Sequence, residues 1–158
     1  MAGELKTQGT ELFILDETGS PQRIVKIGKL SAIDSVGGSA SEIDITNFDS
    51  EAMEYLVGLI DNGTANMSIN LDPTDASHQL LESIAGGDRY YFALGMSDGT
   101  ADPIPNPSGA GISVAIGRSW LTFQASVQQW QYGFTTNDAI RVSSSLRITG
   151  AITLFPRS

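Results

Sequence analysis

The chain has 158 residues, of which 41% are hydrophobic, and this length suits one domain with a substantial core. It has no cysteine and one histidine, His78, which excludes disulfides and thiolate sites and argues against a histidine-based metal site or catalytic triad. The net charge of −9 argues against a protein that grips nucleic acid, because such proteins carry basic surfaces. No apolar run approaches the roughly 18 residues of a membrane helix, and the N-terminus lacks a basic region followed by an apolar stretch. We therefore expect neither membrane insertion nor Sec export.

The N-terminal third of the chain predicts an extended N-terminal segment followed by strands. Residues 1–10 form this N-terminal arm, and the apolar run 11–16 forms a short strand before a turn. Residues 22–34 are rich in Ile and Val and predict one long strand, and the glycines and serines of 35–41 predict a flexible turn.

Two segments alternate between apolar and polar residues. In residues 41–48, Ile43 and Ile45 point to one side, and Glu42 and Asp44 point to the other. In residues 64–71 the apolar positions are Met67, Ile69 and Leu71, and the polar positions are Asn66, Ser68 and Asn70. This period of two predicts half-buried antiparallel strands that each present one polar face.

The connection between these two strands, residues 48–63, is unusually apolar. Connections normally run over the surface and are polar. This one carries seven large apolar side chains before the turn signal "DNG": Phe48, Met53, Tyr55, Leu56, Val57, Leu59 and Ile60. Such a segment needs a surface to cover it, and no other part of the sequence is an obvious internal partner.

Residues 72–87 predict the single helix. Asp72 or Asp75 can cap its N-terminus, Pro73 suits the first turn, and two glycines end it. Apolar residues at helical spacing give it one face that packs on a sheet.

The C-terminal half predicts a strand in 89–99, a Pro- and Gly-rich loop in 100–111 and two long strands. Residues 118–136 alternate, but their apolar residues change from odd to even positions near Gln128 and Gln129, which predicts a bulge or bend.

The last strand, residues 139–155, spans about 50 Å if it is straight. It must therefore bend or extend toward a neighbour. The polar side chains of this strand share one face: Arg141, Ser143, Ser145, Arg147, Thr149 and Thr153. The expected fold is mainly β, an antiparallel sandwich or partial barrel with one flanking helix, in a single domain over residues 11–155.

Few residues are candidates for chemistry. Asp72 and Asp75 could bind calcium or exchange protons, but both suit helix capping, and His78 is expected at the surface or in a cap. Glu51 and Glu54 have no obvious base or metal partner. Three aromatic residues could form a sugar-binding platform, although core packing is the favoured role for most of them: Trp120, Trp130 and Tyr132.

Charge is distributed unevenly along the chain. Up to Gly111 there are 17 acidic and five basic residues, or −12, and from Ile112 onward there are one and four, or +3. This is either ordinary surface variation or a sign that oppositely charged faces of different copies meet.

Three segments, taken in order, resemble the major tail tube proteins of long, non-contractile-tailed bacteriophages. They are "EYLVGLIDNG", "NLDPTDASHQLLESI" and "RYYFAL", and the C-terminal "WLTFQASVQQWQYGFTTNDAIRVSSSLRITGAITL" resembles the closing pair of long strands in that family. The likeness runs from Thr10 to Leu154. The Pro-rich loop 100–111 is longer than the family pattern.

The resemblance implies a structural virion protein and not an enzyme, with no cofactor. It would form hexameric rings that stack into a tube, with viral DNA passing through the lumen without specific binding. Implied partners are further copies of the chain, the tail terminator, the baseplate or distal tail proteins and the tape measure protein. Assembly would occur in the host cytoplasm, and the product would be the tail of the virion.

The resemblance also implies roles for particular residues. Residues 46–63 correspond to an assembly loop that orders between subunits and rings, so the apolar side chains of 48–63 would be buried on a neighbouring copy. Because an acidic or neutral wall repels or ignores phosphate, we expect five residues to face the lumen: Glu42, Asp44, Asn66, Ser68 and Asn70.

Two alternatives remain open at this point. The first keeps the fold but places it in a tube of a type VI-like or pyocin-like secretion or injection machine. The second is a carbohydrate-binding β-sandwich that uses the three aromatic residues, which would be a stable monomer and would leave 48–63 unexplained.

Overall fold

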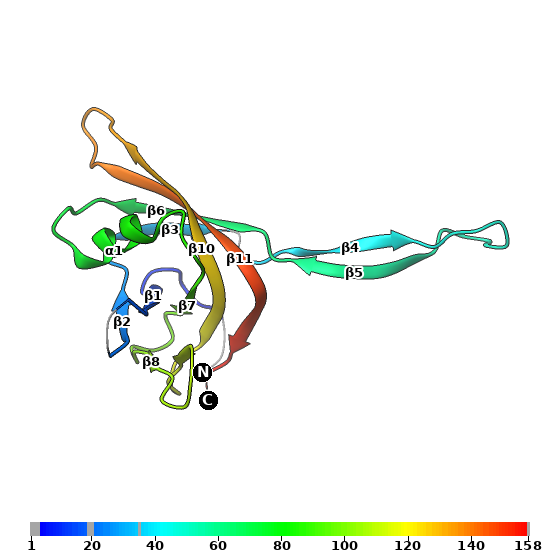
Figure 1. Cartoon of the computed structure of the whole chain (residues 1–158), viewed down its shortest axis with the longest axis horizontal. Coiled ribbons are helices and arrows are strands. Elements are labelled where there is room, and N and C mark those ends of the chain that lie inside the picture. Colours follow the sequence, from blue (N-terminus) through cyan, green and yellow to red (C-terminus); the bar gives the residue numbers. More distant parts are fainter. Residues whose placement is uncertain (1–3, 19–20, 35, 158) are drawn as a thin grey trace.

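The structure is a computed structural model that describes residues 4–18, 21–34 and 36–157. It consists of a curled sheet with one helix, from which a long two-stranded arm projects (Figure 1). The sheet has seven antiparallel strands in the order β2-β1-β7-β10-β11-β6-β3. Their bounds are Glu11–Asp16 (β1), Arg23–Lys26 (β2), Leu30–Asp34 (β3), Thr64–Asn70 (β6), Tyr90–Gly95 (β7), Trp120–Gly133 (β10) and Arg141–Phe155 (β11). The prediction of a mainly β partial barrel with one helix is confirmed.

The concave side of the sheet holds the main core. Buried Leu, Ile, Val and Phe side chains of β1, β6, β7, β10 and β11 pack there, and helix α1 (Ala76–Ile84) adds Leu81 and Ile84. A smaller cluster of Phe13, Ala93 and Trp120 lies on the other side of the sheet. The helix therefore covers the core of the partial barrel.

The two longest strands bend, as their sequence predicts. The register between β10 and β11 shifts between Val127 and Gln129, which confirms the bulge expected near Gln128. A second shift lies between Thr122 and Gln124, opposite the stretch that contains Gly150 at φ +80°. These irregularities increase the local twist and let the hairpin wrap around the core.

The single long strand predicted for residues 22–34 is wrong. The chain turns between β2 and β3, where Lys29 adopts φ +56°. The Gly28 amide donates to Ser77 Oγ at 3.1 Å, and the Gly28 carbonyl lies 2.6 Å from His78 Nε2. Contacts with the helix, which are remote in sequence, therefore break the strand.

Asp75 caps helix α1, and its carboxylate accepts from the Ser77 amide at 2.9 Å. His78 is buried, with 1% of its surface exposed, so the expectation of a surface or capping role is wrong. Its Nδ1 accepts from the Asp72 amide at 3.0 Å, which leaves Nε2 to donate to the Gly28 carbonyl. The histidine thus ties the helix to the turn between β2 and β3.

Two shorter features complete the described part of the fold. Residues 100–111 are not all loop, because β8 (Ile104–Pro105) pairs with β9 (Ile112–Ser113). Of the N-terminal segment, residues 1–3 lie outside the described residues. Residues 4–10 contain a turn and are held to the body by Ser97, which donates to the Lys6 carbonyl at 2.6 Å.

Candidate functional site

The arm is a β-hairpin made of β4 (Ser39–Asp44) and β5 (Tyr55–Asp61). It projects away from the sheet, and residues 45–54 form its tip (Figure 1). The strand predicted at 41–48 is present, but it begins at Ser39, within the turn predicted for 35–41, and ends at Asp44. Its predicted half-burial is wrong for the single subunit, since every residue of β4 is exposed. Much of the segment that the sequence predicts as a loop is strand β5.

All seven apolar residues predicted as contacts lie on this arm. Each is exposed, and Val57 and Leu59 keep 80% and 90% of their surface accessible. Two further apolar residues of the arm, Ile43 and Ile45, are exposed as well. Monomeric proteins rarely expose contiguous apolar patches of several hundred Å², and the arm is therefore a candidate interaction surface.

The arm presents two different faces. The register places Glu42 opposite Val57 and Asp44 opposite Tyr55, and directly opposite residues share a face. The other face carries the pair Ile43 and Leu56. One face is therefore mixed acidic and apolar, and the other is apolar, so either side can bury apolar surface against a partner.

The arm is also uniformly acidic. Residues 39–61 contain six acidic residues and no basic residue: Glu42, Asp44, Asp49, Glu51, Glu54 and Asp61. A surface that receives the arm must therefore be apolar and must tolerate or attract negative charge.

The base of the arm packs closely and is attached to β11. A Cβ on Gly38 would lie 1.7 Å from the Asp61 carbonyl oxygen, so only glycine fits between the two chains there. Arg147 forms an ion pair with Asp61 at 3.1 Å, and Asn62 donates to the carbonyl of Gly150. These contacts anchor the arm to the body while the rest of it projects.

The second candidate surface is the polar face of β6, β11 and the distal half of β10. In the register Ser68 lies opposite Ser143, and Ser143 lies opposite Gln131. The same face continues with Asn66 and Asn70 on β6. It is built mainly from hydroxyl and amide side chains, as the alternation in the sequence predicts.

The structure does not bring the five lumen candidates together. Asn66, Ser68 and Asn70 lie on β6 in the body, but Glu42 and Asp44 lie on the arm. Their common alternating pattern indicated two strands, and it carried no information about where each strand lies in the fold.

Two arginines lie on the polar face, and each pairs within the same chain. Arg141 Nε is 3.3 Å from Asp138, and Arg147 pairs with Asp61 at the arm base. The Gly63 amide, followed by Arg147, lowers the pKa of Asp61, and the Ala139 amide, followed by Arg141, lowers that of Asp138. Both carboxylates therefore remain ionised and offset the arginine charges. The alternation of polar and apolar residues along β11 predicted that both arginines lie on this face. The pairing of Arg147 with Asp61 has no signal in the sequence.

The body sheet has three unpaired edges among the described residues. Strands β2 and β3 end the sheet on its two sides. On β10, pairing with β7 covers Trp120 to Ala125 only, so the distal segment Gln128–Gly133 has β11 as its single neighbouring strand. Unpaired backbone edges are hazards for a monomer and docking sites in an assembly.

The three aromatic residues do not form a platform. Trp120 is fully buried beside Phe13, with ring centroids 5.7 Å apart, and its indole donates to the Ala115 carbonyl. Trp130 is partly buried against the core, and only Tyr132 is largely exposed, at 44%. The flat aromatic surface that a sugar-binding module needs is therefore not formed.

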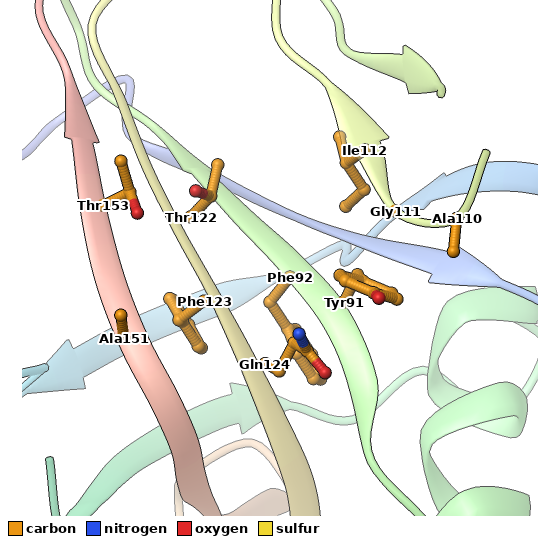
Figure 2. Close-up of a pocket in the computed structure, with 10 residues that line it drawn as sticks. All are labelled: Tyr91, Phe92, Ala110, Gly111, Ile112, Thr122, Phe123, Gln124, Ala151 and Thr153. Carbon is orange, nitrogen blue, oxygen red and sulfur yellow. The ribbon is translucent and has the colours of Figure 1, made fainter. Parts of the chain in front are cut away.

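A surface pocket beside β7 and β10 also lacks reactive groups. The pocket, of about 230 Å³, lies between β7, β10, β11 and the β8–β9 hairpin (Figure 2). The Tyr91 phenol is the one titratable group in its lining, which is otherwise apolar, hydroxyl or amide. Within the described residues, no three His, Asp or Glu side chains gather as a metal site requires, and no helix is long and apolar enough to cross a membrane.

The sequence matches a family model and a known phage protein over nearly its whole length. The family model described as "Phage tail tube, TTP, lambda-like" matches residues 3–158. Structural protein 3 of Pseudomonas phage PAJU2 is 30% identical over 158 residues, covering 98% of this chain and 95% of that protein.

Solved structures share the fold at low sequence identity. The SPP1 tail tube has a TM-score of 0.66 at 13% identity, over 96% of this chain and 78% of that one. The tail of a gene transfer agent particle, refined with C6 symmetry, has a TM-score of 0.59 at 17% identity, over 92% and 96%. The sheath–tube complex of the extracellular contractile injection system PVC reaches 0.65 at 9% identity, over 98% and 93%. On the match to the family model and to the phage PAJU2 protein, the chain belongs to the lambda-like family of phage tail tube proteins and is a structural component of the virion tail.

Proposed function

We propose that this chain polymerises as stacked hexameric rings whose lumen conducts viral DNA during ejection. The observation that carries the proposal is the projecting arm, whose seven exposed apolar side chains have no partner within the described residues of one subunit. The C6 symmetry of the gene transfer agent tail, which shares the fold, supports a six-membered ring.

The unpaired strand edges support ring closure. Strands β3, β6, β11 and β10 alternate in direction, so β10 runs antiparallel to β3. Rotation about the tube axis preserves the axial direction of each strand, and the β3 edge of a second copy would therefore meet distal β10 in antiparallel orientation. Such pairing satisfies the free backbone groups of both edges and continues the sheet from one subunit to the next.

The arm is the second assembly element. Residues 46–63 would dock on a neighbouring copy and bury Val57, Leu59 and the other exposed apolar side chains. Burying one such side chain is worth about 1.5–3 kcal/mol, so several of them supply a large part of the free energy of assembly.

The polar face of β6 and β11 would line the lumen. Asn66, Ser68 and Asn70 would then offer DNA an uncharged surface, which neither binds phosphate strongly nor repels it. Glu42 and Asp44 would face the lumen if the arm of the assembled subunit reaches the channel.

We further propose that the protein has no enzymatic activity, since the described residues form no metal-binding cluster.

The proposed partners are the tail terminator, the baseplate or distal tail proteins and the tape measure protein, with assembly in the host cytoplasm. Chains that share the fold occur in structures of a sheath/tube terminator, a tube-terminating cap and a baseplate from contractile injection systems. These assemblies support the proposal of partners at the two ends of the tube.

Electron microscopy of the concentrated, negatively stained protein tests the proposal. We expect hollow tubes or stacked rings with six-fold end views and a channel wide enough for duplex DNA. Sealed fibres or a channel narrower than a duplex would contradict it. If the protein remains monomeric, hydrogen exchange should be fast at the tip of the arm, residues 46–53, and slower in β4 and β5, which pair with each other. Protection of the tip in a monomer would reject the assembly role of the arm.

A tube of an injection machine is the second candidate, because tubes of contractile systems share the fold. That likeness, at 9% identity, concerns the fold alone. A gene for a contractile sheath next to the gene for this chain would favour the injection machine.

A further inference from the structure

The polar face carries two cationic side chains within the described residues, Arg141 and Arg147, among its hydroxyl and amide groups. Both lie on β11, and about half of each side chain is exposed, 52% and 46%. Exposed arginines on a wall that faces DNA would bind phosphate, since each neutralised phosphate releases counterions and strengthens binding.

Each arginine has a carboxylate that the backbone holds in place. Asp61 Oδ1 accepts from the Gly63 amide at 2.9 Å, and Asp138 Oδ1 accepts from the Ala139 amide at 2.8 Å. The turns that follow β5 and precede β11 therefore position these carboxylates independently of the guanidinium groups. The two pairs arise at separate places in the fold, one at the arm base and one at the β10–β11 turn.

Stability does not account for these pairs. Exposed ion pairs contribute about 0–1 kcal/mol, and the four side chains are all largely solvent-accessible. Their larger effect is on the surface field, because a cation within 3.1–3.3 Å of a carboxylate presents a dipole in place of a net positive charge.

We propose that Asp61 and Asp138 act as counter-charges that prevent Arg147 and Arg141 from retaining DNA phosphate along the tube wall. This inference rests on the proposed function, which places this face in the lumen. The ligand is duplex DNA, and the two aspartates keep the affinity of the polar face for it low.

The test uses tubes assembled from the full chain and a fluorescent 20-base-pair duplex, with co-sedimentation measured at 50 and 200 mM salt. Wild-type tubes should retain little duplex. The Asp61→Asn/Asp138→Asn variant should retain more, and each exposed arginine that gains a phosphate contact should add a roughly three- to four-fold loss of affinity between the two salt concentrations.

Two controls separate masking from other effects. Asp34 lies on β3 directly opposite Asn66 and so shares the polar face. Asp34→Asn removes one acidic charge there without exposing an arginine, so retention should stay close to that of wild type. Arg147→Gln breaks the same ion pair as Asp61→Asn but leaves no cation, so it should also match wild type. Equally raised retention by Asp34→Asn and by Asp138→Asn, which each remove one negative charge, would show that only net charge matters. Raised retention by Arg147→Gln would show that the bridge only positions the arm. Either result would overturn the proposal.

Two further variants keep the test decisive. If Asp61→Asn impairs assembly, Asp138→Asn alone carries the prediction, because it lies at the β10–β11 turn away from the arm. Labelling of Ser143→Cys tubes locates the face: a small maleimide should react and a dextran-coupled maleimide too large for the channel should not. Reaction with both would place the face outside the tube and reject the lumen assignment together with the inference. Exclusion of the large reagent with unchanged retention by the aspartate variants would reject the inference alone.

Discussion

The arm and the body are both built from apolar strands and differ completely in burial. In β1, five of six residues are buried, whereas β4 and β5 contain no buried residue. Both β1 and β5 carry large apolar residues in succession. The difference shows that an apolar segment between turns specifies a strand, and that the fold decides whether its side chains are buried within the same subunit.

The largest expected effect is on assembly. Val57→Asp/Leu59→Asp places two charges on the most exposed apolar positions of strand β5 and should abolish tube formation, because both side chains would be buried on a neighbour. The midpoint of thermal unfolding of the monomer should not change, since neither residue contacts the core. Tubes in wild-type abundance, counted in negative-stain images, would show that the arm is not an assembly element.

The largest expected effect on the body is at Arg118. Its side chain is 1% exposed, donates to four backbone carbonyls and pairs with Glu11 at 3.0 Å. Arg118→Met leaves these acceptors unpaired and should lower the free energy of unfolding by about 3–5 kcal/mol, measured by urea denaturation. The matched control Arg89→Met, at an exposed position, should change it by less than about 0.5 kcal/mol. Equal effects would contradict the role of Arg118 as a buried hydrogen-bonding centre.

A matched pair of leucines sharpens the comparison between the two regions. Leu146 is fully buried in the body, and Leu56 is 53% exposed on the arm. Leu146→Ala should destabilise the monomer by about 2–5 kcal/mol, and Leu56→Ala by less than about 0.5 kcal/mol. A large loss of monomer stability for Leu56→Ala would mean that the arm folds back on the body in solution.

The smallest expected effect is the dependence of body stability on pH. Hydrogen bonds from the Thr74 hydroxyl, then the contact with Lys29, lower the pKa of Asp72 from 3.8 to about 2. Because the folded pKa is lower than the unfolded one, this stabilisation is present above about pH 4 and is lost as the pH falls toward 2. The difference in unfolding midpoint between wild type and Asp72→Asn should therefore shrink between pH 5 and pH 2. A constant difference would exclude the titration of Asp72 as its cause.

Local features of the fold were predictable from the sequence. The bulge near Gln128 follows from the change of apolar phase, and the Asp75 cap follows from its place before a helical period. The break at Lys29 was not predictable, because it depends on contacts of Gly28 with Ser77 and His78, some 50 residues away. The alternation of apolar and polar residues in 22–34 carries no information about contacts with a helix so distant in the sequence.

The site was predictable in composition but not in arrangement. The sequence identified the seven apolar residues of the arm and the polar positions of β6, since both are patterns along one strand. It grouped Glu42 and Asp44 with Asn66, which the fold separates, and it missed the pairing of Arg147 with Asp61. Contacts between elements distant in sequence are set by the sheet order, and alternation does not encode that order.

The negative charge of the arm should weaken contacts between the arms of free subunits. The most adhesive surface of the molecule carries six acidic groups and no basic one, so two arms that meet side by side bring like charges together as they bury apolar area. At physiological salt this repulsion acts within about 8 Å, so two arms meet it before their apolar side chains come into contact at about 4 Å. We therefore expect arms to disfavour one another at the last step of an encounter, which would help to keep free subunits apart.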